Sequence, residues 1–179
     1  MEAPSVTGDA FKAAIGSFAA GVTIVTTIDP AGAPEALTAT AFSSVSVSPP
    51  LCLVCIDRRA RPHRPLLTKG SFAINILSAE QEALSVRFAA PIPDRFAGVS
   101  WHPGEVTRCP IIPGAIACME CHVVEVHCGG DHDIFLARVA SVRVGDGTPL
   151  VYWRGRYSSL RSSPKGAATG TLQSTSPVP

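Results

Sequence analysis

Residues 38 to 50 form an uncharged segment that is rich in hydroxyl groups and lies between apolar runs. From Phe42 onward, successive side chains alternate between two faces, which indicates a strand. Pro49 and Pro50 end this strand, because proline cannot donate a hydrogen bond to a sheet. Small side chains let a flat ligand approach the backbone, whose N–H groups can bind an anion without a lysine. A barrel strand with a serine-rich solvent face fits the same pattern, so the residues alone leave both interpretations open.

Strands outnumber helices along the rest of the chain, and short hairpin connections join most of them. This organisation predicts a mainly β fold, an antiparallel barrel with a few helices. The predicted strands span residues 22–28, 42–48, 51–56, 71–77, 115–127, 131–144 and 148–152.

Two main helices are expected. The first is capped by Thr7 or Asp9 and runs to about Ala20, and the second begins at Ser78 with Gln81 in the capping-box position. The apolar stripes comprise Phe11, Ile15, Phe18 and Ala19 on the first helix, and Leu84, Val86 and Phe88 on the second. An apolar stripe at this spacing is typical of a helix that packs on a core.

Length and composition indicate one packed domain. The chain has 179 residues, of which 46% are hydrophobic and 16% charged. We expect a lead-in at 1–8, the domain at 9–161, and a flexible Ser/Pro/Gly/Thr-rich tail at 162–179. The net charge of +1 gives no general attraction to nucleic acid or to an anionic membrane. No apolar run is long enough to span a bilayer and no secretory signal is visible, so a cytoplasmic location is expected.

Two cysteine pairs, Cys52-x-x-Cys55 and Cys118-x-x-Cys121, have the internal spacing of a zinc site. Both pairs lie in predicted strands, where positions three apart point to opposite faces, and the pairs are too far apart in sequence for a usual zinc motif. The better interpretation is buried free thiols that act as small hydrophobic groups. No metal site is therefore expected.

Five motifs follow one another along most of the chain. They are Phe18 to Thr27, Thr38 to Leu51, Phe72 to Gln81, Gly130-Asp131-His132-Asp133-Ile134-Phe135, and Pro149 to Tyr157. In this order they resemble the flavin reductase family, the small reductase components of two-component flavin-dependent monooxygenases. One such motif would be weak, but five in register are specific for the family.

The resemblance implies the FMN-binding split β-barrel, normally a homodimer with flavin at the subunit interface. It also implies an NAD(P)H:flavin oxidoreductase that reduces FAD or FMN and supplies free reduced flavin to a separate FADH2-dependent monooxygenase. FAD is favoured because the resemblance is to reductases of FADH2-dependent hydroxylases, and NADH because no separate basic cluster for a 2′-phosphate is evident. The alternatives on the same barrel are a non-catalytic flavin carrier and an FMN oxidase of the pyridoxamine-phosphate type.

The resemblance assigns cofactor contacts to residues on two consecutive strands and the loop that follows. The strand residues are Thr38, Ala39, Thr40, Ala41, Ser43, Ser44, Val45 and Cys55. The loop holds four arginines in residues 58–64, and guanidinium groups suit phosphate oxygens. Asp57, Arg58 and Arg61 are therefore expected along the ribityl and phosphate end of the flavin. A solvated basic loop is the alternative.

His132 is the candidate catalytic residue. In the family, the histidine of the Gly-Asp-His motif lines the nicotinamide pocket, so His132 is expected to contact the carboxamide or a phosphate of NAD(P)H. The alternative is a histidine at a strand entry that bonds to a nearby carbonyl. Arg156 and Tyr157 match the C-terminal motif, which in the family reaches toward the same site.

Two further residues have a family role and a structural alternative. Asn75 is the one large polar side chain in its predicted strand, and the resemblance places it beside the flavin; a buried asparagine must in any case be hydrogen-bonded. Gln81 is a cofactor residue by resemblance and a helix cap by position.

The irregular segment 91–113 is either a lid, a partner contact or a plain surface excursion. Glu120 is expected to face outward from its strand.

Overall fold

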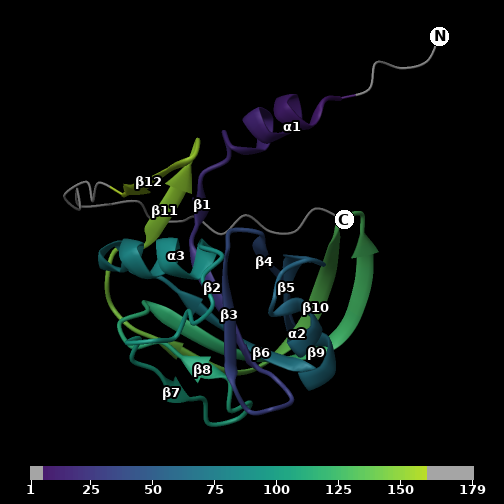
Figure 1. Ribbon diagram of the computed structural model, residues 1–179, viewed down its shortest axis with the longest axis vertical. Helices are drawn as coiled ribbons and strands as arrows, with labels where there is room; N and C mark the ends of the chain where they lie inside the picture. Colours follow the sequence, from purple (N-terminus) through teal and green to yellow (C-terminus); the bar gives the residue numbers. More distant parts are fainter. Residues whose placement is uncertain (1–5, 161–179) are drawn as a thin grey trace, which may run out of the picture.

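The computed structural model describes residues 6–160 of the chain (Figure 1). The predicted tail at 162–179 and the first five residues of the predicted lead-in lie outside the described residues. Most of the described chain folds around one β structure, from which a short N-terminal helix projects (Figure 1).

The main sheet has seven antiparallel strands in the order β3-β2-β6-β9-β10-β5-β4. They are β2 (Thr23–Ile28), β3 (Pro34–Ala39), β4 (Phe42–Val47), β5 (Pro50–Asp57), β6 (Ser71–Ile76), β9 (Ala117–Gly129) and β10 (His132–Val144). The sheet curls into a barrel in which β3 and β4 are the two edge strands (Figure 1). The predicted mainly β class is confirmed, and the chain steps from one sheet edge to the other through the two residues at 40 and 41.

Two smaller sheets complete the fold. One joins β1 (Ala20–Gly21), β11 (Leu150–Trp153) and β12 (Arg156–Ser159), and the other joins β7 (His102–Pro103) and β8 (Pro110–Ile111). The β11–β12 hairpin extends beyond the barrel on the same side as the N-terminal helix (Figure 1). The sequence did not predict β12, because its residues 156–159 carry no alternating apolar pattern.

The core lies inside the barrel and beneath one helix. Val25, Val54, Ile74 and Phe135 belong to the barrel cluster, which consists of buried side chains from facing strands. A second cluster packs strand β2 and the start of β11 against α3 (Glu82–Ala89), whose Phe88 is fully buried. Because β2 contributes to both clusters, it is apolar on both faces, which explains its β-branched sequence.

The second predicted helix is present as η1 (Ala79–Gln81) followed by α3. The backbone N–H of Ser78 donates to Gln81 Oε1 at 3.1 Å, so the predicted capping box is confirmed. The inclusion of Val86 in the core face was wrong, because α3 turns this side chain toward solvent while Phe88 is buried. The remaining helix, α2 (His63–Lys69), follows β5.

The first helix differs from its prediction. Helix α1 (Gly8–Ile15) is capped by Thr7, whose Oγ1 accepts from the Ala10 N–H at 3.2 Å, but it ends several residues before Ala20. None of its residues is buried: Phe11 is 61% exposed, and Phe18, which follows the helix, is 73% exposed. The stripe has no core to pack on within residues 6–160, because α1 stands away from the barrel (Figure 1).

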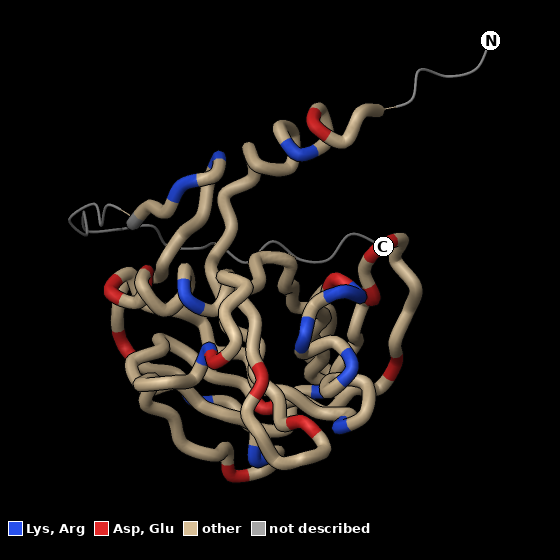
Figure 2. Tube along the Cα trace, viewed as in Figure 1, with Lys and Arg blue, Asp and Glu red and all other residues tan. Residues whose placement is uncertain are grey.

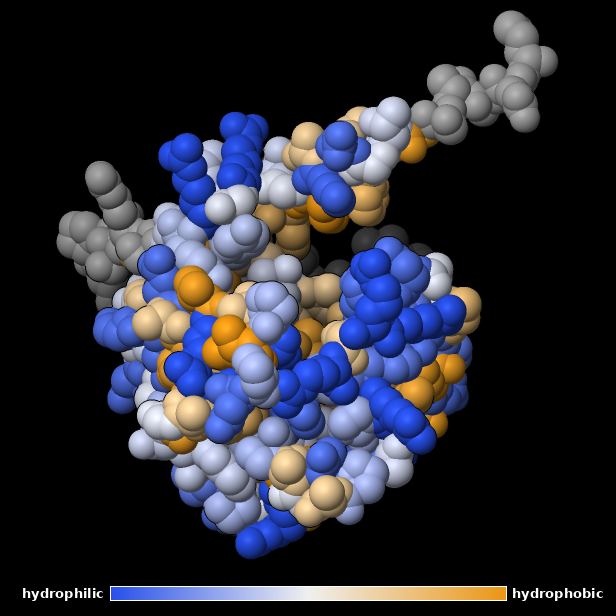
Figure 3. Space-filling view, in the orientation of Figure 1, coloured by the Kyte–Doolittle hydropathy of each residue, from blue (hydrophilic) through white to orange (hydrophobic). Residues whose placement is uncertain are grey.

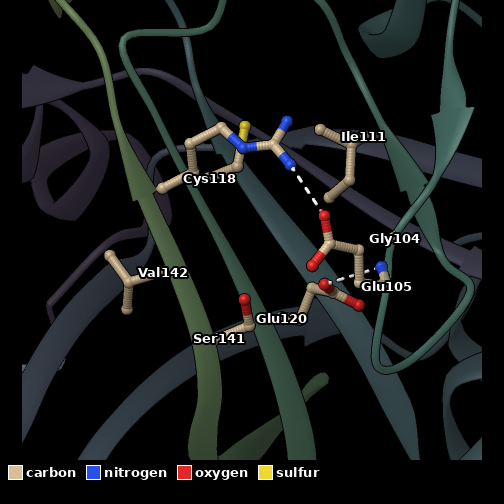
Figure 4. Close-up of a pocket in the computed structure, with 8 residues that line it drawn as sticks. Gly104, Glu105, Ile111, Cys118, Glu120, Ser141 and Val142 are labelled. Carbon is tan, nitrogen blue, oxygen red and sulfur yellow. Dashed lines mark hydrogen bonds and ion pairs between the residues drawn. The ribbon is translucent and has the colours of Figure 1, made fainter.

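The irregular segment 91–113 is fixed to the barrel at several points. The buried carboxylate of Glu120 on β9 accepts hydrogen bonds from the backbone N–H groups of Glu105, Val106 and Thr107 and from the Thr107 hydroxyl, at 2.6–3.0 Å. Figure 4 shows Glu120 beside the Glu105 backbone. The expectation that Glu120 faces outward was wrong, since this loop folds over it. In this structure, hydrogen bonds to Glu120 hold the segment over strand β9.

All six cysteines are free thiols, and four of them are buried, as predicted; Cys55 is half-buried and Cys128 is exposed. The buried Cys52 and Cys121 lie side by side, with their sulfur atoms 3.7 Å apart. In the part of the chain that the structure describes, no group of three or more metal-ligating side chains comes together. Across residues 6–160, no helix has the length and apolar character needed to traverse a bilayer.

Candidate functional site

A cavity of about 620 Å³ opens where the chain steps from edge strand β3 to edge strand β4. One wall is the β4–β5 end of the barrel and the other is formed by α1 and the β11–β12 hairpin. Its lining residues are Lys12, Ile15, Gly16, Phe18, Ala20, Thr40, Ala41, Phe42, Ser43, Leu53, Cys55, Tyr152 and Gly155. Figure 3 shows α1 overhanging the body of the molecule with apolar side chains on its underside. The size suits a small-molecule ligand.

The barrel wall of the cavity combines the small residues Thr40, Ala41, Ser43 and Cys55 with the larger Phe42 and Leu53. The Cys55 N–H donates to the Ala41 carbonyl at 3.0 Å, and Ser43 lies opposite Leu53 in the β4–β5 register. Because β4 is an edge strand of the sheet, the backbone groups on its outer side have no strand partner among residues 6–160. A flat ring can therefore lie against this wall and meet both hydroxyl and backbone groups.

The opposite wall explains why the apolar stripe of α1 is not packed on the core. Ile15 and Phe18 line the cavity together with Tyr152 of β11. Two hydrogen bonds tie the residues after α1 to the hairpin: the Trp153 indole N–H donates to the Ser17 carbonyl at 3.1 Å, and the Arg154 N–H donates to the Gly16 carbonyl at 2.8 Å. These contacts hold the apolar side chains over the cavity.

The predicted cofactor strand contributes to this cavity in part. Of its eight residues, Thr40, Ala41, Ser43 and Cys55 line the cavity. The other four residues do not: Thr38, Ala39, Ser44 and Val45 lie outside the lining. The Thr38 hydroxyl donates to the Ser85 carbonyl at 2.7 Å and so anchors α3. A register shift between Ser44 and Ser46 interrupts the alternation expected for the strand.

Three of the four arginines of the basic loop after β5 pair with carboxylates, and none of the four lines the cavity. Arg58 pairs with Asp133 at 2.7 Å, Arg59 with Asp57 at 2.9 Å and Arg61 with Glu35 at 2.6 Å. Hydrogen bonding from Arg59 lowers the pKa of Asp57 to about 2. The predicted phosphate contacts of Asp57, Arg58 and Arg61 are therefore not assembled within this cavity, and each arginine would have to leave a carboxylate to bind a phosphate.

His132 lies at the start of β10, opposite Asp57 of β5, and outside the lining of the cavity. Its Nδ1 atom is 2.7 Å from Asp131 Oδ1. This hydrogen bond lowers the pKa of Asp131 below its ordinary value. The imidazole is partly exposed, with 41% of its side-chain surface accessible, so it remains available to a ligand. The alternative that His132 bonds to a backbone carbonyl does not fit this contact.

Asn75 and Gln81 both make hydrogen bonds within the fold, and neither lines the cavity. Asn75 is fully buried; its amide donates to the Ile24 carbonyl at 3.2 Å and accepts from the Ile112 N–H at 2.8 Å. The amide of Gln81 caps η1 and donates to the Pro113 carbonyl at 2.8 Å. Both side chains thus use their polar atoms to hold the segment 91–113 against the barrel.

The two predicted C-terminal residues differ in position. The Tyr157 hydroxyl is 2.8 Å from Ser85 Oγ, which fixes β12 to α3, and Arg156 is exposed on β12. Neither lines the cavity. From the same hairpin, Tyr152 lines the cavity, and its ring packs edge-on against the Tyr157 ring with 5.2 Å between the centroids. The sequence analysis did not identify Phe18 and Tyr152 as site residues, although both lie within motifs that carry the family resemblance.

Comparison with known proteins agrees with this arrangement. The sequence profile described as "Flavin reductase like domain" matches residues 15–161. The chain belongs to the flavin reductase family. A flavin reductase (NADH) from Kitasatospora aureofaciens is 42% identical over 168 residues, covering 91% of this chain and 88% of the relative. The reductase subunit HsaB of a flavin-dependent monooxygenase from Rhodococcus jostii (strain RHA1) is 36% identical, covering 84% of this chain and 76% of the relative.

Solved structures show the same fold. An NADH:FAD oxidoreductase from Streptomyces globisporus, in complex with NAD and FAD fragments, superposes with a TM-score of 0.81 at 35% identity and covers 91% of this chain and 99% of that one. For this flavin reductase, the predicted family, split-barrel fold class and oxidoreductase class are confirmed, as is the pairing of a flavin with a nicotinamide co-substrate. The lining fits a flavin, because apolar walls face each other across small hydroxylated residues.

Proposed function

We propose that the chain is an NADH-dependent flavin reductase, with FAD favoured over FMN, that supplies free reduced flavin to a separate monooxygenase. The observation that carries the proposal is the apolar cavity at the step between the two edge strands, lined by small residues of the family's own motif. Relatives named as reductase subunits of flavin-dependent monooxygenases support the partner class.

The reaction asks the protein mainly for position. The bound flavin and NADH together supply hydride transfer, and the polypeptide orients the two rings. Ala41 and Ser43 leave room for a ring against β4, while Phe42 and Leu53 supply apolar surface. On the other side, Phe18 and Tyr152 cover the cavity and limit the access of water to it. The outer backbone N–H groups of β4 are suited to donate to an oxygen of the ring, where they would stabilise negative charge.

The decisive experiment mixes the purified protein with NADH and either FAD or FMN and follows the loss of NADH absorbance. We expect rapid NADH oxidation that depends on added flavin, faster with FAD than with FMN. Binding of flavin without NADH consumption would instead support the non-catalytic carrier. A protein that purifies yellow and retains FMN through dialysis would support the pyridoxamine-phosphate type of oxidase.

The proposed assembly is a homodimer. Strand β4 is a sheet edge, and its Val45 and Val47 are 48% and 94% exposed; Val142 and Val144 of β10 are also exposed. Exposed β-branched side chains that lie together favour packing against a second copy. We expect sedimentation velocity to give the mass of two chains, and a single-chain mass at micromolar concentration would contradict the dimer.

The family role proposed for His132 can be tested by its replacement. His132→Ala is expected to raise the KM for NADH about tenfold and to change flavin affinity little, because the proposed contact is to the nicotinamide nucleotide. The measurements are steady-state kinetics and a flavin-binding titration. His122→Ala, an exposed histidine of β9, is the matched control and should behave as the wild type. An equal loss of NADH and flavin affinity in the His132 variant would contradict the assigned role.

A further inference from the structure

A second hollow of about 650 Å³ lies next to the ring cavity, between α1 and the turn of the β11–β12 hairpin. It is lined by Lys12, Ala13, Gly16, Ser17, Arg154 and Gly155. Three of these residues, Lys12, Gly16 and Gly155, also line the ring cavity, so the two spaces are neighbours. Figure 2 shows the basic positions of α1 and of the β11–β12 hairpin at the same end of the molecule.

The charged residues that line this hollow are all cations. Its lining has two cations, Lys12 and Arg154, and no carboxylate. Within residues 6–160, neither cation takes part in an ion pair, whereas Arg58, Arg59 and Arg61 of the loop after β5 are each paired. Lys12 and Arg154 can thus meet an anionic ligand without breaking an existing pair.

The two cations are held on elements that are tied together. The bond from the Arg154 N–H to the Gly16 carbonyl, 2.8 Å long, joins the hairpin turn to the end of α1. The Arg154 guanidinium lies over the Trp153 ring, 4.8 Å from its centroid, which restricts the side chain. Arg154 also has a left-handed backbone (φ 48°), which the following Gly155 (φ 76°) continues. The small residues between the cations leave their approach open.

We propose that Lys12 and Arg154 form a subsite for the pyrophosphate of a dinucleotide whose ring occupies the adjoining cavity. This inference rests on the proposed function and deepens it, because it assigns the class of ligand to pyrophosphate-bearing nucleotides. A guanidinium and an ammonium group that line one hollow suit a pyrophosphate, which carries two negative charges. NADH and FAD share this chemistry, and the experiment distinguishes them.

The test uses Lys12→Gln and Arg154→Gln in the full chain, with ligands that have or lack phosphate. The donors are NADH and N-benzyl-dihydronicotinamide, and the acceptors are FAD and riboflavin. Each variant is expected to raise the KM for one pyrophosphate-bearing ligand about tenfold, with little change in kcat and none for the phosphate-free ligand. A rise for NADH assigns the subsite to the donor, and a rise for FAD assigns it to the acceptor.

The controls separate charge from general damage. Lys12→Arg should restore the wild-type KM, and Lys69→Gln, which removes a charge from the end of α2, should have no effect. Added salt should raise the same KM in the wild type more than in the variants. Unchanged KM values for both NADH and FAD, or equal losses with the phosphate-free ligands, would overturn the proposal.

A binding measurement with ADP-ribose tests the subsite independently of the enzyme activity. ADP-ribose carries the pyrophosphate without a reactive ring, and its binding can be followed through the fluorescence of Trp153, with Trp153→Phe identifying the signal. If the wild type fails to oxidise NADH yet binds ADP-ribose through Lys12 and Arg154, the proposed function fails and the subsite stands. An active enzyme in which ADP-ribose does not bind, or binds equally to the variants, refutes the subsite alone.

Discussion

Ala41→Trp is expected to lower kcat/KM for flavin-dependent NADH oxidation by at least about a hundredfold, which corresponds to about 2.7 kcal/mol. Ala41 is an exposed residue at the step between β3 and β4, and its side chain borders the ring cavity. An indole at this position would occupy space that the small side chains of the strand leave open. The backbone bond from Cys55 to Ala41 does not depend on the side chain, so the barrel should remain folded.

The measurements are a flavin-binding titration, steady-state kinetics and the melting temperature. Ala31→Trp, which adds the same side chain to the exposed turn between β2 and β3, is the matched control and should retain activity. Ser43→Phe fills the cavity from the next position on the wall and should reproduce the loss. Near-normal flavin affinity in Ala41→Trp, with an unchanged melting temperature, would show that the ring does not lie along β4.

The sequence was most informative where a local pattern decides the structure. Alternation and the following prolines predicted β4, and the capping box at Ser78 and Gln81 predicted the start of η1. Part of the cavity lining, at Thr40, Ala41 and Ser43, followed from the resemblance of the same segment. These features depend on neighbours in the chain, which a sequence displays directly.

Features set by distant contacts were not predictable from the local pattern. The stripe of α1 has the spacing of a core-facing helix, yet bonds from the β11–β12 hairpin to residues 16 and 17 hold it over the cavity instead. Asn75 has the polarity of a ligand contact, but its partners Ile24 and Ile112 come from remote segments. Similarly, the arginines of the basic loop have the charge of a phosphate site. Only the fold shows that Asp133 and Glu35, which are distant in sequence, pair with Arg58 and Arg61.

Tertiary structure also decides the role of Glu120, whose loss is expected to destabilise the fold strongly. Glu120→Ala is expected to lower the free energy of unfolding by about 3 to 5 kcal/mol, because three backbone N–H groups and a hydroxyl would lose their acceptor. Urea denaturation of the full chain measures this loss. Glu125→Ala removes an exposed carboxylate from the same strand and should change stability by less than about 1 kcal/mol.

The pH dependence gives this assignment a second, independent test. Burial alone would raise the pKa of Glu120, but the hydrogen bonds from Thr107, Val106 and Glu105 outweigh it and lower the pKa below the ordinary value. The carboxylate therefore contributes stability that is fully present above its unfolded-state pKa and is lost as the pH falls through its folded-state pKa. The stability difference between the wild type and Glu120→Gln should be largest near neutral pH and should shrink in acid. A difference that stays constant down to low pH would show that the charge of Glu120 does not hold the loop.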